Sequence, residues 1–134
     1  MEKIVIEAVD SNLGTVNEFI EGVLEAADCP MKALMQIELA VEEIFVNICH
    51  YAYAPETGEA EISVGITEEN SVMIVFSDSG IPYDPLAKDD PDISLSVQER
   101  AIGGLGIFMV KKYMDEVIYD YSEGRNNLTL IKRL

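Results

Sequence analysis

An acid and an amide lie four residues apart in an otherwise apolar stretch of the sequence. Glu43 and Asn47 interrupt the run ELAVEEIFVNICHYAY, which covers residues 38–53. If this stretch is helical, residues four apart are neighbours on one side of the helix. An amide oxygen is a ligand that Mg2+ accepts, and a carboxylate can remove a proton from a nucleophile. The pair therefore fits a metal-assisted reaction centre, although every amphipathic surface helix also has a polar face.

The spacing of apolar residues predicts that residues 31–52 form this helix. At about 100 degrees per residue, one stripe collects Leu34, Ile37, Val41, Ile44, Phe45, Ile48 and Ala52. The opposite side collects Gln36, Glu43, Asn47 and His50. Glu38 and Glu42 lie nearer the flank of the apolar stripe, which separates them from the acid–amide pair. His50 has no assigned chemistry, and we expect it to be structural.

A second feature is an Asp-x-Gly turn that follows an apolar segment. Residues 72–76 run into the sequence SDSGIPYDP, which begins at residue 77. A carboxylate at Asp78 can accept a hydrogen bond from an exocyclic amine such as that of adenine. Gly80 permits the backbone to approach the base closely. Asp and Gly are also ordinary turn residues, so a surface turn explains the same letters.

A third feature is the glycine-rich sequence GGLG at residues 103–106, in front of an apolar segment. The free N–H groups at the start of a helix bind phosphate well. They would let a chain of net charge −16 hold a triphosphate through its backbone and magnesium, without a basic patch. The spacing matches neither the P-loop nor the dinucleotide motif. The glycines can also act as hinges of a loop, which is compatible with phosphate binding.

The composition fits one folded domain over residues 1–134. Hydrophobic residues make up 49% of the chain, enough for a core without disulfides. The excess of 25 acidic over 9 basic residues argues against a nucleic-acid binder; it fits a basic partner or simply an acidic surface. Cys29 and Cys49 lack the spacing of a disulfide framework or zinc site. With no signal-peptide or membrane-spanning segment in the sequence, we expect a cytoplasmic protein with no membrane association.

The predicted element order is β-α-α-β-β-loop-α-β-β. Strands are expected over residues 3–9, 61–66, 72–76, 117–121 and 128–132. Helices are expected after a cap at Ser11 or Asn12, over 31–52 and over about 104–114, with a mobile loop over 86–102. This order predicts an α/β two-layer sandwich, in which three helices cover one face of a mostly antiparallel sheet.

With the three features in this order, the chain resembles the GHKL ATPases, the superfamily of gyrase, histidine-kinase and MutL-type nucleotide-binding domains. Within that superfamily it is most similar to the anti-sigma-factor serine/threonine kinases. The likeness covers nearly the whole chain and is carried by EEIFVNICHYAY, DSGIPYDP, ERAIGGLGIFMVKKYMDEVIY and NNLTLIKRL. DxGxPxDP followed by GGLGIF is specific to this branch, whereas an Asn four residues after a Glu is shared by the superfamily.

The resemblance implies roles for the acid–amide pair and for the Asp-x-Gly turn. It implies that Asn47 binds Mg2+, that Glu43 is the general base and that Asp78 hydrogen-bonds the amino group of adenine. The family often has a Thr after the last turn, near the adenine. The matching position here is Asn126, with Thr129 nearby, so the sequence leaves open which of the two contacts the base.

The resemblance also implies how the rest of an ATP pocket is built. The glycines that would shape it are Gly80, Gly104 and Gly106. Residues 86–102 would form the ATP lid, with Arg100 as its phosphate contact.

The reaction implied by the resemblance is transfer of the ATP γ-phosphoryl group to a serine of an anti-anti-sigma (STAS-type) protein. A sigma factor is a further partner that the resemblance suggests, and no direct contact with nucleic acid is expected. The exposed first strand could pair across a homodimer, as the resemblance suggests, or it could be capped within the chain.

Two alternatives remain at this point. The same residues would serve a non-catalytic, nucleotide-gated module that binds a partner. An acidic cation-binding protein using Asp89, Asp90 and Asp92 would need no nucleotide, but the spacing of these residues lacks the EF-hand series.

Overall fold

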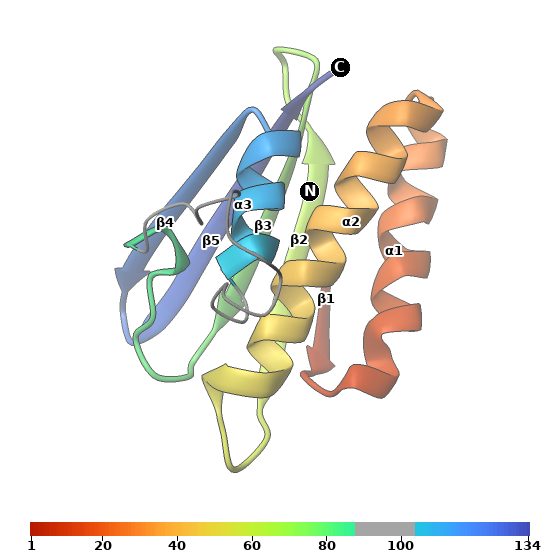
Figure 1. Cartoon of the computed structure of the whole chain (residues 1–134). Coiled ribbons are helices and arrows are strands. Elements are labelled where there is room, and N and C mark those ends of the chain that lie inside the picture. The colour runs from red at the N-terminus through yellow and green to blue at the C-terminus, as the bar shows by residue number, and fades with distance from the viewer. Residues whose placement is uncertain (88–103) are drawn as a thin grey trace.

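A five-stranded antiparallel sheet forms one layer of the computed structural model, which describes residues 1–87 and 104–134 (Figure 1). Its strands are β1 (Glu2–Glu7), β2 (Glu59–Ile66), β3 (Ser71–Asp78), β4 (Glu116–Ser122) and β5 (Arg125–Arg133). Their order across the sheet is β1-β2-β3-β5-β4, and every neighbouring pair is antiparallel.

Helices form the second layer, on one face of this sheet (Figure 1). They are α1 (Leu13–Ala26), α2 (Met31–Asn47) and α3 (Gly104–Tyr113), and α2 contacts both of the others. After Asn47 the helix continues as a π-helical turn, η2 (Ile48–Ala52). Short 3-10 turns are η1 (Asp10–Asn12) and η3 (Pro85–Ala87). The predicted α/β two-layer sandwich is therefore confirmed.

Element boundaries differ from the predicted ones at several ends. β3 extends to Asp78, beyond the predicted end at residue 76, and β5 begins at Arg125, before the predicted start at residue 128. β1 ends at Glu7 and does not continue to residue 9, because the chain leaves the sheet to form η1. The helix expected over residues 31–52 is α2 followed by the wider turn η2. The closing hairpin is confirmed, and its turn residues Glu123 and Gly124 both have positive φ (55° and 75°), as a type I′ turn requires.

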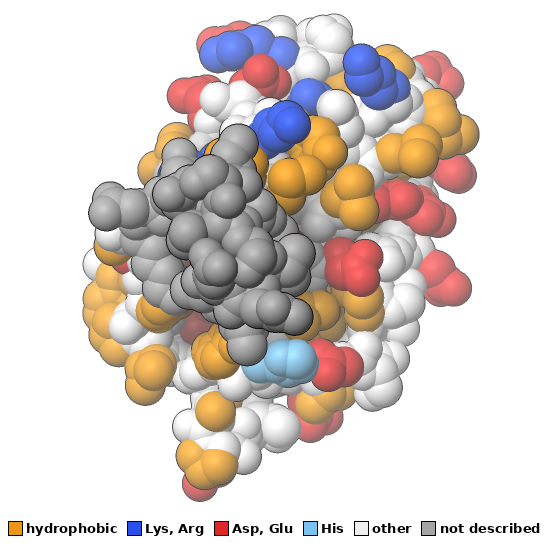
Figure 2. All heavy atoms as spheres, viewed as in Figure 1, with side chains coloured by type: hydrophobic (Ala, Val, Ile, Leu, Met, Phe, Trp, Pro, Cys, Tyr) orange, Lys and Arg blue, Asp and Glu red, His pale blue; other side chains and the backbone are white. Residues whose placement is uncertain are grey.

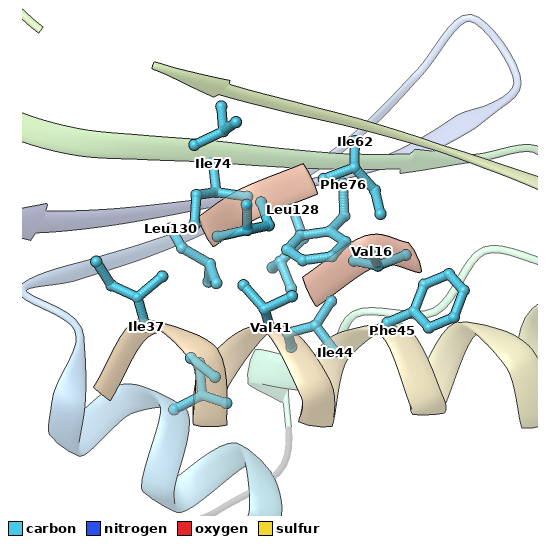
Figure 3. Close-up of a cluster of buried hydrophobic side chains, with 14 of the residues drawn as sticks. Val16, Ile37, Val41, Ile44, Phe45, Ile62, Ile74, Phe76, Leu128 and Leu130 are labelled. Carbon is cyan, nitrogen blue, oxygen red and sulfur yellow. The ribbon is translucent and has the colours of Figure 1, made fainter. Parts of the chain in front are cut away.

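The core lies between the sheet and α2 (Figure 3). Alternate residues of the strands point into it, because successive side chains of a strand face opposite sides. The buried side chains in Figure 3 include Ile62, Ile74, Phe76, Leu128 and Leu130 from the sheet and Ile37, Val41, Ile44 and Phe45 from α2. The predicted apolar stripe of α2 is therefore the buried face. Ala52, the last residue of that stripe, lies in η2, is half-buried and packs against the core.

Charged side chains are unevenly placed on the face shown in Figure 2. Lys and Arg gather toward the end of the molecule that holds the C-terminus, while Asp and Glu are spread along the side formed by α1 and α2. Two lysines in the last turn of α3 and two basic residues at the end of β5 belong to this end: Lys111, Lys112, Lys132 and Arg133.

Candidate functional site

A cavity of about 380 Å3 opens between the end of α2, the turn η2 and the ends of β3 and β5. Most of its lining is apolar: Ile44, Ile48, Tyr51, Ala52, Phe76, Ile81, Tyr83, Pro85, Tyr119 and Leu128. Its polar lining residues among those described are Asn47, Asp78 and Asn126. A mainly apolar cavity with a few convergent polar groups is the usual form of a small-molecule site.

Asp78 is the last residue of β3 and is only 5% exposed. Its Oδ1 accepts a hydrogen bond from the backbone N–H of Gly80 at 2.9 Å and another from the side-chain amide of Asn126 at 3.0 Å. Within the described part of the chain, no hydrogen bond reaches Oδ2 of Asp78. This oxygen can therefore accept a donor from a molecule bound in the cavity.

The turn after Asp78 packs tightly against η2. The backbone N–H of Ile81 donates to the carbonyl oxygen of Ala52 at 3.0 Å. A Cβ atom at Gly80 would collide with that same carbonyl group. A residue without a side chain is therefore required here, and it brings the Asp-x-Gly turn against the end of the long helix.

Asn126 lies beside Asp78 because β5 pairs with β3 in a register that aligns these two residues. It is 8% exposed. Successive residues of β5 alternate between the faces of the sheet, so Leu128 lines the cavity and Thr129 faces away from it. Of the two residues that the sequence left open, the structure brings Asn126 to the cavity.

Glu43 and Asn47 meet on α2, as their spacing predicts. The side-chain amide of Asn47 donates to Oε1 of Glu43 at 3.4 Å, and both residues are half-buried. Asn47 lines the cavity, and no described residue donates a hydrogen bond to its Oδ1. That free amide oxygen is the kind of ligand that Mg2+ accepts.

Gly106 of α3 makes room for the Glu43 carboxylate. A Cβ atom at residue 106 would overlap the carboxylate of Glu43. Gly104 is the first residue of α3, so the glycine-rich sequence does begin a helix. Arg100 and all of the predicted lid except residues 86 and 87 lie outside the described residues, as do the acidic residues at 89, 90 and 92.

Three tyrosines of the cavity were not identified as site residues from the sequence: Tyr51, Tyr83 and Tyr119. Tyr119 lies on β4 and is the last residue of the segment ERAIGGLGIFMVKKYMDEVIY, 13 residues after Gly106. Burial raises the pKa of its hydroxyl group above the ordinary value, so the phenol keeps its proton and acts as a donor. Tyr83 stands inside the motif DSGIPYDP and Tyr51 inside EEIFVNICHYAY, so the available signal was the position of each tyrosine within a segment that carries the resemblance.

His50, which the sequence left without a chemical role, lies in η2 and pairs with a residue of η1. Its Nε2 is 2.8 Å from Oδ2 of Asp10. This contact connects η2 with η1. His50 does not line the cavity.

The fold and this cavity match a known family. Residues 6–132 match the family model described as the histidine kinase-like ATPase domain, and the chain belongs to this family. The GHKL-type recognition made from the sequence is therefore confirmed. Of the solved structures, the histidine kinase domain from the Erythrobacter litoralis EL346 blue-light activated histidine kinase is similar. It superposes with a TM-score of 0.55 over 92% of this chain and 60% of that chain, and at 14% sequence identity the likeness shows the fold alone.

The chain is also similar in sequence to curated proteins named as serine-protein kinases. The serine-protein kinases RsbW of Bacillus cereus (strain AH820) and Bacillus thuringiensis (strain Al Hakam) are each 32% identical over 92 residues. These matches cover 66% of this chain and 57% of each relative, so they span little more than half of the relatives' length.

Two further observations concern metals and membranes. In residues 1–87 and 104–134, no three His, Cys, Asp or Glu side chains gather into a group that could hold a metal ion. No helix in these two ranges has the length and apolar character needed to cross a membrane.

Proposed function

We propose that the chain binds ATP with Mg2+ in this cavity and transfers the γ-phosphoryl group to a serine of a protein partner. The observation that carries the proposal is the buried carboxylate of Asp78 at the polar end of an apolar cavity, where no described residue donates to its Oδ2. A flat, apolar base with an exocyclic amine suits such a cavity, because the amine would donate to Oδ2. Adenine has this shape and this donor.

The triphosphate would lie toward α3 and the acid–amide pair. Three groups support this placement: the N–H groups at the start of α3, the Oδ1 of Asn47, to which no described residue donates, and the adjacent carboxylate of Glu43. Asn47 would hold Mg2+ together with phosphate oxygens and water. The metal ion would supply charge neutralisation on the phosphates. Gly80, Gly104 and Gly106 would shape the pocket.

Glu43 would act as the general base for the serine hydroxyl. In the transfer, the serine oxygen forms a bond to the γ-phosphorus while the bond from that phosphorus to the β–γ bridging oxygen breaks, and ADP leaves. The proton of the hydroxyl goes to the Glu43 carboxylate. The hydrogen bond from Asn47 would keep this carboxylate on the side of the phosphates.

The partner is proposed from relatives and from resemblance. The curated relatives are named serine-protein kinases, and the resemblance from the sequence is to the anti-sigma kinases. An anti-anti-sigma protein of the STAS type is therefore the proposed substrate, in the cytoplasm, with a sigma factor as a second partner and a homodimer as the proposed assembly.

The experiment is incubation of the purified chain with γ-labelled ATP, Mg2+ and an anti-anti-sigma protein. Label on a serine of the partner, with ADP formed in equal amount, supports the kinase. Tight ATP binding that changes partner affinity without any label on the partner would instead favour the nucleotide-gated module. Failure to bind ATP at all would refute both.

A further inference from the structure

The side-chain amide of Asn126 has all of its hydrogen-bonding capacity in use inside the protein. Its Nδ2 donates to Oδ1 of Asp78 at 3.0 Å and to the carbonyl oxygen of Ile81 at 2.9 Å. Its Oδ1 accepts from the backbone N–H of Tyr83 at 3.1 Å and from the hydroxyl of Tyr119 at 2.5 Å. A carboxamide offers two N–H donors and two lone pairs. None is left over for a bound base.

The four bonds join three separate segments at one end of the cavity. Asp78 ends β3, Ile81 and Tyr83 belong to the turn that follows, and Tyr119 comes from β4. Asn126 is nearly fully buried, so breaking any of these bonds would leave a polar group unpaired away from water. The amide is therefore held in one orientation.

Asn126 in turn limits how the Asp78 carboxylate can rotate. The last torsion of an Asp side chain is broad, so a single hydrogen bond fixes it poorly. Here Oδ1 is held from two directions, by the Gly80 N–H and the Asn126 amide. With Oδ1 held, Oδ2 also has a fixed position at the cavity wall.

We propose that Asn126, supported by Tyr119, is a positioning residue that aims Oδ2 of Asp78 at the exocyclic amine of the base and makes no contact with the base itself. The inference rests on the proposed function, because it assigns a role within the same nucleotide site. It differs from the expectation drawn from the resemblance, which made Asn126 a candidate contact of adenine. A fixed acceptor at this place selects bases that present an amine there and disfavours those that present a carbonyl oxygen or hydrogen.

The test compares ATP with purine riboside triphosphate, which lacks only the 6-amino group. Dissociation constants of both are measured for the wild type and for N126A, Y119F and N127A. The wild type should bind ATP at least about tenfold more tightly than the analogue, the value of one charge-assisted hydrogen bond. In N126A this ratio should fall close to one, and in Y119F it should be intermediate. N127A is the matched control, since Asn127 is the adjacent residue on the other face of β5 and should keep the full ratio.

A double-variant cycle separates positioning from direct contact. In an Asp78→Ala background, N126A should cause no further loss of ATP affinity if Asn126 acts through Asp78. A further loss as large as in the wild-type background would overturn the proposal and make Asn126 a base contact. An undiminished ratio in N126A and Y119F would also overturn it. If N126A does not fold, as judged by circular dichroism, Y119F decides alone, because it keeps the ring and removes only one donor.

The outcomes also distinguish this inference from the proposed function. If the wild type binds neither nucleotide, the proposed function fails. If the wild type binds ATP and discriminates against the analogue, but the variants discriminate equally well, the nucleotide site stands and the positioning role of Asn126 fails.

Discussion

Asn47 lines the cavity, and Glu43 lies next to it on α2 as its hydrogen-bond partner. The amide nitrogen of Asn47 donates to Glu43. In the proposed site, the oxygen of that amide would bind the cation and the second oxygen of the carboxylate would take the proton. The pair is held between α2 and α3, because Gly106 lets the helices approach at the carboxylate. Binding and transfer should therefore be separable by substitution of the acid alone.

We predict that Glu43→Gln keeps ATP affinity within about twofold and lowers phosphoryl transfer at least about a hundredfold, the usual contribution of a general base. Glutamine preserves the shape and can still accept from Asn47, but it cannot take the serine proton. Isothermal titration and a γ-labelled ATP assay measure the two quantities. Glu42→Gln, at the adjacent exposed position, is the control and should leave both unchanged. Normal transfer by the Glu43 variant would remove it from the catalytic role.

In the proposed site, Asp78 accepts a hydrogen bond from the exocyclic amine of the base. We predict that Asp78→Asn weakens ATP binding about tenfold or more, because an amide group can place a donor against the amine where the carboxylate offered only acceptors. Asp120→Asn on the exposed part of β4 should have no effect. The measurement is the dissociation constant of ATP at constant ionic strength. An unchanged value would show that the base binds elsewhere.

At the scale of elements, two helix glycines differ in their surroundings. A Cβ atom at Gly106 would overlap the Glu43 carboxylate, whereas one at Gly22 of α1 would meet nothing within 4 Å. We predict that Gly22→Ala stabilises the fold by about 1 kcal/mol, because alanine is the better helix former. Gly106→Ala should displace the Glu43 side chain and lower transfer while the protein still folds. Urea unfolding and the labelled-ATP assay measure the two effects; full transfer activity in Gly106→Ala would contradict the packing argument.

The contact between α1 and α2 brings acidic side chains together. Desolvation by burial, a hydrogen bond to Glu21 and the charges of Glu21 and Glu25 raise the pKa of Glu38 to about 7, from an ordinary value of 4.5. Between pH 4.5 and about 7, Glu38 therefore carries a proton in the folded protein but has released it in the unfolded chain. Because of Glu38, the free energy of unfolding decreases as pH rises from about 4.5 to 7, and it does not decrease further from this cause above pH 7.

We predict that Glu38→Gln removes this part of the pH dependence. Urea unfolding at pH 5 and pH 8 should show a smaller decrease for the variant than for the wild type, and the variant should be the more stable of the two at pH 8. Glu42→Gln is exposed on the same helix and should keep the wild-type decrease. An equal decrease in all three proteins would show that Glu38 is ionised in both states.

The elements were largely predictable because their signals are local. The stripe of α2 and the alternation in β2 and β3 follow from the period of each structure. Ile48 and Ala52 of the stripe lie in the π-helical turn η2 and still pack in or against the core. The contact of Asn126 with Asp78 depends on the pairing of β3 with β5. The contact of Tyr119 with Asn126 depends on the pairing of β4 with β5. The residues of the site could thus be named in part, but not their hydrogen-bond partners.

At the scale of the whole molecule, nucleotide binding should increase the free energy of unfolding. A ligand that binds only the folded state raises the free energy of unfolding by about 2.7 kcal/mol when it is present at a hundred times its dissociation constant. We predict a higher melting temperature with ATP and Mg2+, and a much smaller rise for Asp78→Asn at the same concentrations. Differential scanning fluorimetry measures both. No rise for the wild type would refute nucleotide binding in the folded state.

The pairing of β3 with β5 also has a consequence for folding. Asp78 and Asn126 are 48 residues apart in sequence, yet they lie side by side in the ladder. The hairpins β2–β3 and β4–β5 join strands that are close in the chain, so each can form early, whereas closing the loop between β3 and β5 costs more chain entropy. The cavity of the proposed site has lining residues from both hairpins. We therefore expect ATP binding to become possible only when the two hairpins pair with each other, late in folding and after most of the secondary structure has formed.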